Sequence, residues 1–179
     1  MASQLASNSI LPYRPGRAWW LLAGLAALAV PLAGCSASAQ EESRVKSVEA
    51  KIDGLTCPTC VPPLTNSLHQ QFDKAKIQVD DEKDTATVQF DEKQAFSDET
   101  FRQAASDVRM SVVYYRVQAC GRIESSGTER WLKAGTNRFL VQSDQQLPVD
   151  KPLCLDGRVD PSKQPATFEV SAFELQKVN

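Results

Sequence analysis

Residues 45–72 read VKSVEAKIDGLTCPTCVPPLTNSLHQQF, and this stretch contains the two periodicities that decide the predicted fold. Over residues 45–53 apolar side chains alternate with polar ones, which predicts a strand with one buried face. Over residues 61–72 apolar side chains recur every three or four positions, which predicts a helix. The loop between them carries Cys57 and Cys60. A strand, a cysteine-bearing loop and a helix are therefore expected in succession.

The residues that follow continue this series of strands and helices. Residues 75–79 and 86–90 alternate on either side of a charged turn, which predicts a hairpin. Ser97 and the two acidic residues after it suit the start of a second helix, and residues 112–117 read as a strand. The order β-α-β-β-α-β over residues 45–118 predicts a ferredoxin-like domain, in which a four-stranded sheet carries both helices on one face.

The last third of the chain has a different pattern. Residues 119–179 contain five short strand-like runs separated by turns rich in Gly, Ser, Asn and Pro, which predicts a small all-β barrel or half-barrel. The run LDGRV at 155–159, followed by a long closing strand, resembles small OB-type barrels. Since no flexible linker precedes this part, we expect one long strand through residues 112–123 to be shared. The predicted fold class is α+β, a ferredoxin-like βαββαβ domain followed by an OB-like barrel or half-barrel.

Cys57 and Cys60 are the candidate metal ligands. They are separated by two residues at a junction between loop and helix, so their sulfurs can converge on one ion. The positive end of the helix favours the thiolate form. Thiolates prefer soft ions such as Cu(I) and Hg(II), whereas structural zinc normally takes four protein ligands. The predicted ligand is therefore a soft metal ion.

The segment GLTCPTC at 54–60 resembles the Gly-Met-Thr-Cys-x-x-Cys motif of heavy-metal-associated domains, among them the periplasmic mercuric-ion-binding proteins. The resemblance covers residues 45–117. It implies carriage, sequestration or sensing of the ion, with ligand exchange between this chain and a donor or acceptor protein. Leu55 replaces the usual Met, and Arg109 and Met110 stand where the family often has Gly-Tyr. Met110 is a candidate auxiliary thioether ligand, and packing in the core is the alternative role for it.

Two other functions use the same residues. The Cys-Pro-Thr-Cys sequence resembles the redox motif of thiol-disulfide oxidoreductases, although residues 64–147 contain no proline for the turn that the thioredoxin arrangement requires. The other alternative is an envelope assembly or interaction protein with a vestigial cysteine domain. The sequence has no Ser-His-Asp, phosphate-loop or paired-carboxylate pattern, so we do not expect an enzyme. A net charge of −2 and scattered Lys and Arg residues argue against a nucleic-acid partner.

Residues 1–34 have the layout of a bacterial export signal. Arg14 and Arg17 precede an apolar run at 18–33, which is short for a membrane span. The run ends in Leu-Ala-Gly-Cys, which resembles the lipobox of bacterial lipoprotein precursors and implies cleavage before Cys35 and its acylation, so that the chain is anchored in a lipid bilayer. An ordinary cleavage site is the alternative. By analogy with that lipoprotein family, Ser36 in place of an aspartate implies the outer membrane, with the protein facing the periplasm. Residues 35–44 are expected to form a polar tether.

Cys120 and Cys154 remain after these assignments. Because thiols in exported proteins are usually disulfide-bonded or metal-bound, we expect a disulfide between them, with membership of the metal site as the alternative. His69 is the only histidine. Its position beside Leu68 predicts a solvent-facing side chain, so we do not expect it to bind the ion.

Overall fold

The computed structural model describes residues 42–91 and 94–176. Each strand and helix that the sequence predicts between residues 45 and 118 lies at its expected place. In chain order the elements are β1 (Arg44–Asp53), the 3-10 turn η1 (Pro58–Cys60), α1 (Val61–Gln71), β2 (Lys76–Asp80), β3 (Thr85–Gln89), α2 (Asp98–Asp107), β4 (Ser111–Ser126), β5 (Glu129–Ala134), β6 (Asn137–Gln142), β7 (Pro152–Asp160) and β8 (Thr167–Leu175).

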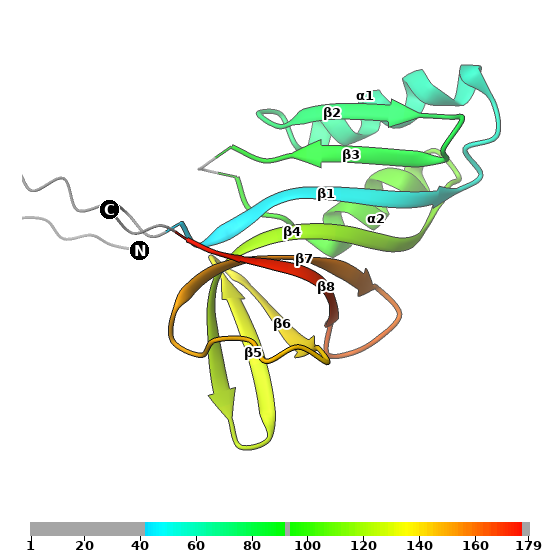
Figure 1. The fold of residues 1–179 in the computed structure, drawn as a ribbon. Helices are drawn as coiled ribbons and strands as arrows, with labels where there is room; N and C mark the ends of the chain where they lie inside the picture. Colours follow the sequence, from blue (N-terminus) through cyan, green and yellow to red (C-terminus); the bar gives the residue numbers. More distant parts are fainter. Residues whose placement is uncertain (1–41, 92–93, 177–179) are drawn as a thin grey trace, which may run out of the picture. The chain divides into compact units, whose positions relative to one another are not determined.

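The strands of the described residues pair in one continuous sheet. Its eight strands follow the order β2-β3-β1-β4-β5-β6-β8-β7 (Figure 1). β7 also pairs with β4, so that five of these strands close into a barrel. β6 and β8 run parallel, whereas β7 pairs antiparallel with both β4 and β8. The barrel is thus closed, and the half-barrel alternative does not hold.

β4 is the strand that joins the barrel to the rest of the sheet. It is 16 residues long and runs without interruption through residues 118 and 119. Its first part pairs with β1 and its last part with β5, while β7 lies along its other edge. The expectation of one long shared strand is confirmed.

The predicted fold class is wrong. The described residues are mostly β, with half of them in strands and 18% in helices, and they form a closed five-stranded barrel with further strands attached. Residues 45–118 do not fold into a separate ferredoxin-like domain, because β4 continues into the barrel and hydrogen-bonds to β7 within the supposed domain. Periodicity along one strand identifies that strand, but it does not say which distant strands pair with it.

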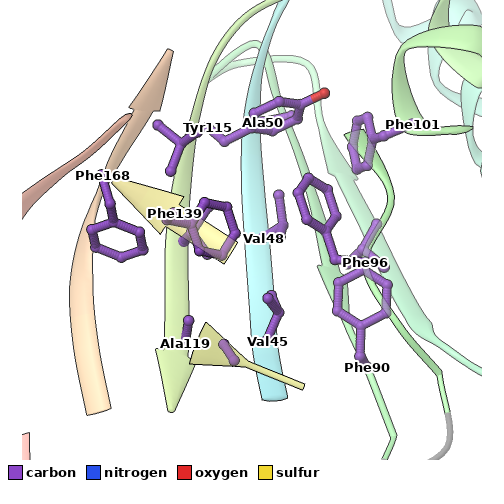
Figure 2. Packing of buried hydrophobic residues seen from close by; sticks show 14 of the residues in the cluster. Val45, Val48, Ala50, Phe90, Phe96, Phe101, Tyr115, Ala119, Phe139 and Phe168 are labelled. Carbon is purple, nitrogen blue, oxygen red and sulfur yellow. The ribbon is translucent and has the colours of Figure 1, made fainter. Parts of the chain in front are cut away.

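A single hydrophobic core runs from the helices into the barrel. Val48, Ala50 and Ile52 alternate inward on β1, and a bulge between Val45 and Ser47 restores the inward direction at Val45. Figure 2 shows the aromatic side chains beside them. The Tyr115 ring lies edge-on to Phe96 and Phe101, at centroid distances of 5.4 and 5.5 Å. On the barrel side Phe139 and Phe168 form a similar pair at 5.6 Å.

The export signal, the lipidation site Cys35 and the tether up to residue 41 lie outside the described residues. None of the helices between residues 42 and 176 that the structure describes has the length and hydropathy of a membrane span.

Candidate thiol site

The thiol loop, residues 54–60, leaves β1 through a sharp turn. Gly54 has φ +93°, a left-handed conformation that suits glycine. A Cβ there would lie 3.5 Å from the Cγ of Met110, so the loop passes close to the segment between α2 and β4. Leu55 is fully buried and holds the loop on the core, as a Met at that position would. The exposed part of the loop is therefore fixed to a rigid base.

Cys57 and Cys60 are brought together by the short turn between them. The backbone is extended at Cys57 and turns through η1, where the N–H of Cys60 donates to the carbonyl of Cys57 at 2.9 Å. The two residues form a disulfide with a Cα–Cα distance of 5.3 Å, and both are half-buried. The Cys57 sulfur also lies 3.2 Å from the Thr59 hydroxyl. The predicted convergence of two sulfurs at the surface is present, in oxidised form.

The start of α1 offers few hydrogen-bond donors to a thiolate. The N–H of Val61 donates to the carbonyl of Pro58, and Pro62 and Pro63 have no N–H. Because the positive charge at a helix start resides largely on free N–H groups, this end of α1 is weakly positive. The first turn of α1 also contains no acidic residue.

Met110 and Arg109 differ in their surroundings. Met110 is 8% exposed and belongs to the hydrophobic core, which Cys60 also contacts. Arg109 is exposed and has φ +63°, and its N–H donates to the carbonyl of Ser106 at the end of α2. The packing role of Met110 is thus present, and its role as an auxiliary ligand stays a prediction. His69 is exposed, as expected.

Cys120 and Cys154 form the second disulfide, as predicted. Cys120 lies opposite Arg44, at the start of β1, whereas the thiol loop follows the end of that strand. At about 3.3 Å per residue, the length of β1 separates the two cysteine pairs by roughly 30 Å. Cys120 and Cys154 therefore do not complete the thiol site.

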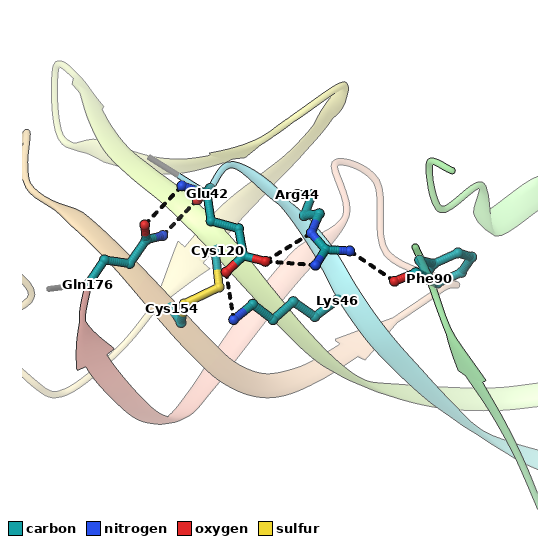
Figure 3. Close-up of polar contacts among 7 residues, drawn as sticks. All are labelled: Glu42, Arg44, Lys46, Phe90, Cys120, Cys154 and Gln176. Carbon is teal, nitrogen blue, oxygen red and sulfur yellow. Dashed lines mark hydrogen bonds and ion pairs between the residues drawn. A yellow bond between two sulfur atoms is a disulfide. The ribbon is translucent and has the colours of Figure 1, made fainter. Parts of the chain in front are cut away.

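A polar cluster surrounds this second disulfide (Figure 3). The Glu42 carboxylate pairs with Arg44 at 2.8 Å and Lys46 at 2.7 Å. Partial burial opposes its ionisation, but hydrogen bonds from Lys46 and Arg44 outweigh this effect and lower the pKa of Glu42 below 4.5. The backbone N–H and carbonyl of Glu42 bind the side-chain amide of Gln176 at 3.0 and 2.6 Å. Residue 42, expected in the tether, is thus held to Gln176, the residue after β8.

Among the described residues, Glu42, Cys120 and Cys154 are the only group of three metal-binding side chains whose ligand atoms lie within 4.8 Å of one another. The two sulfurs are bonded to each other and the carboxylate is neutralised by two cations, so this state offers no free ligand set. Sequence patterns did not indicate the polar cluster around the disulfide, because its members come from distant parts of the chain. Glu42 and Gln176, for example, are 134 residues apart.

Within the part of the chain that the structure describes, the thiol loop is thus the one site at which the predicted ligands meet at the surface. Its interpretation rests on its own geometry. No family model matches the sequence, and no curated protein matches it significantly.

Proposed function

We propose that the protein carries a soft metal ion, Cu(I) or Hg(II), on the thiolates of Cys57 and Cys60. The observation that supports this proposal is the convergence of the two sulfurs on a half-buried loop with a rigid base. Reduction of the disulfide by an external dithiol gives two thiols on a short turn, and these release their protons when they bind the ion. Two-coordinate thiolate binding suits soft ions and leaves the cargo open to ligand exchange with a second protein.

Three features keep the loop ready for the ion after reduction. Leu55 is buried below the loop, Gly54 sets its direction, and Pro58, Pro62 and Pro63 restrict its backbone. A loop that is already ordered loses less conformational entropy on binding. Met110 packs beside Gly54, and we propose its thioether as an auxiliary ligand that approaches when the loop adjusts to the ion.

The metal proposal is tested with the chain from residue 37 onward, which contains all of the described residues. The reduced protein is titrated anaerobically with Cu(I) in competition with a chromogenic chelator. We expect one ion per chain, and loss of this binding in the Cys57→Ser/Cys60→Ser variant. The matched control is Cys120→Ser/Cys154→Ser, which should retain the ion. Equal binding by the wild type and the Cys57→Ser/Cys60→Ser variant excludes the carrier function.

A second candidate is thiol-disulfide exchange, which the Cys57–Cys60 disulfide favours. The start of α1 argues against it, because a strongly stabilised attacking thiolate needs free N–H donors or a nearby cation. Insulin reduction in the presence of dithiothreitol distinguishes the two functions. Turnover that depends on Cys57 would support the redox function, whereas rates equal to those of dithiothreitol alone leave metal carriage as the better proposal.

The cell envelope is the proposed location, with the chain anchored through acylated Cys35 and facing the periplasm. The strand order of the barrel and its parallel β6–β8 pair support an OB-like architecture, and we propose that this part serves docking beside the carrier site. Metabolic labelling with a radioactive fatty acid tests the anchor. The label should be present in the wild type and absent in Cys35→Ser.

A further inference from the structure

A groove of about 710 Å³ crosses the face of the sheet that the helices leave uncovered. On β1 and β4 the side chains that face the helices, such as Val48 and Tyr115, are buried, and those between them point the other way. The groove contains Glu49 from β1, Tyr114 and Arg116 from β4, Asp156 and Arg158 from β7 and Glu169 from β8. Because β4 forms its centre, the groove includes strands of the barrel as well as strands of the helix-covered part of the sheet.

Four charged residues lie in one line across this groove. Glu49 is directly opposite Arg116, Arg116 is directly opposite Arg158, and Arg158 is directly opposite Glu169. The order of charges across the four strands is thus negative, positive, positive, negative. Neighbouring strands are about 4.8 Å apart, so the two guanidinium groups start from adjacent positions.

The two arginines are an unusual pair for a sheet. Like charges directly opposite each other destabilise an antiparallel pair. Arg158 lies over the Tyr114 ring, with its guanidinium carbon 4.1 Å from the ring centroid, which fixes its direction without neutralising its charge. Within the described residues Arg116 has no carboxylate within ion-pair distance, while Glu169 already pairs with Lys163 at 2.9 Å. Asp156, opposite Gln118, is the remaining carboxylate of the groove, and within the described residues it forms no ion pair with either arginine. Two adjacent positive groups thus remain available to an external anion.

We infer that this groove is a docking site for an extended peptide segment of a partner protein, with two carboxylates that bind Arg116 and Arg158. The groove is open and spans several strands, which suits an extended segment better than a small molecule, since small ligands are normally enclosed. Glu49, which forms no ion pair among the described residues, favours a basic residue at its end of the acidic pair. At the other end Glu169 is shared with Lys163, so the preference for a basic residue there is weaker. The site is separate from the thiol loop, and the inference does not rest on metal binding.

The order of charges permits a test with two peptides of equal composition. The complementary peptide is Lys-Gly-Glu-Gly-Glu-Gly-Lys, and the control is the inverted peptide Glu-Gly-Lys-Gly-Lys-Gly-Glu. Both have blocked ends, a fluorescent label and the same net charge, so general attraction affects them equally. Fluorescence anisotropy with the full chain is expected to show binding of the complementary peptide and at least about tenfold weaker binding of the inverted one.

Variants of exposed arginines assign the binding to the groove. Arg116→Gln and Arg158→Gln should each weaken the complementary peptide about tenfold. The control is Arg138→Gln, because Arg138 also lies over an aromatic ring, Trp131, at 4.5 Å, but outside the groove. Equal binding of both peptides, or unchanged binding in the two groove variants, would overturn the inference. Displacement by succinate at the peptide's own concentration would also overturn it, since it would indicate a site for small anions.

Discussion

Cys120 on β4 and Cys154 on β7 are direct cross-strand neighbours, with Cα atoms 3.9 Å apart. Their disulfide links two strands of the barrel that are 34 residues apart in sequence. β5 and β6 lie within the linked segment. The disulfide therefore restricts the unfolded chain over most of the barrel.

Replacement of this disulfide should lower the stability of the whole protein. For a loop of this length the chain-entropy treatment gives a loss of about 3 to 4 kcal/mol in the Cys120→Ser/Cys154→Ser variant. The matched control is Cys57→Ser/Cys60→Ser, where the much shorter loop limits the loss to about 2 kcal/mol or less. Guanidinium unfolding under non-reducing conditions measures both. An equal loss in the two variants would contradict the argument from loop length.

Gly54→Ala should weaken both the fold and the thiol site. An alanine at φ +93° costs roughly 1 to 2 kcal/mol, and its Cβ would contact Met110. Gly127→Ala is the control, because Gly127 also has positive φ but no heavy atom within 4 Å of the added Cβ. We expect similar losses of stability from thermal unfolding. Only Gly54→Ala should lower Cu(I) affinity, and a loss of affinity in Gly127→Ala would show that the effect is general.

Glu42 should make stability depend on pH at the acidic end. Its pKa is lowered in the folded protein, so its ion pairs stabilise the fold fully at pH values above the ordinary pKa of 4.5. This stabilisation is lost as the pH falls through the lower pKa of the folded state. Glu42→Gln should therefore lower Tm at pH 6, and the difference from wild type should disappear toward pH 3. Thermal unfolding across this range measures the difference. A difference independent of pH would assign the effect to packing alone.

Tyr115→Phe should leave stability unchanged or raise it by about 1 kcal/mol. The ring of Tyr115 is fully buried, and its hydroxyl lies near the Asp98 carboxylate without a hydrogen bond of good geometry among the described residues. Burial, together with the nearby Asp98 carboxylate, raises the pKa of this hydroxyl, so it stays protonated at neutral pH. Loss of the hydroxyl keeps the contacts with Phe96 and Phe101. A loss above 1 kcal/mol in chemical denaturation would show that the hydroxyl has a stabilising partner.

The features that depend on residues close together in the sequence were predictable from the sequence. Ser97 accepts from the N–H of Thr100 at 3.2 Å and caps α2 as expected, and the Cys57–Cys60 turn joins residues three positions apart. The wrong fold class and the missed groove share one cause. The pairing of Arg116 with Arg158, like the bond between Glu42 and Gln176, joins distant strands, and local alternation contains no information about such partners.

The length of β4 has a consequence for how the protein opens. β4 is hydrogen-bonded to β1 in the helix-covered part of the sheet and to β5 and β7 in the barrel. If β4 separates from its partners in one part, the core of the other part is exposed as well. We therefore expect β4 to separate from its neighbours only when the whole protein unfolds. An ion bound at the thiol loop would then slow amide hydrogen exchange in the barrel, far from the sulfurs that hold it.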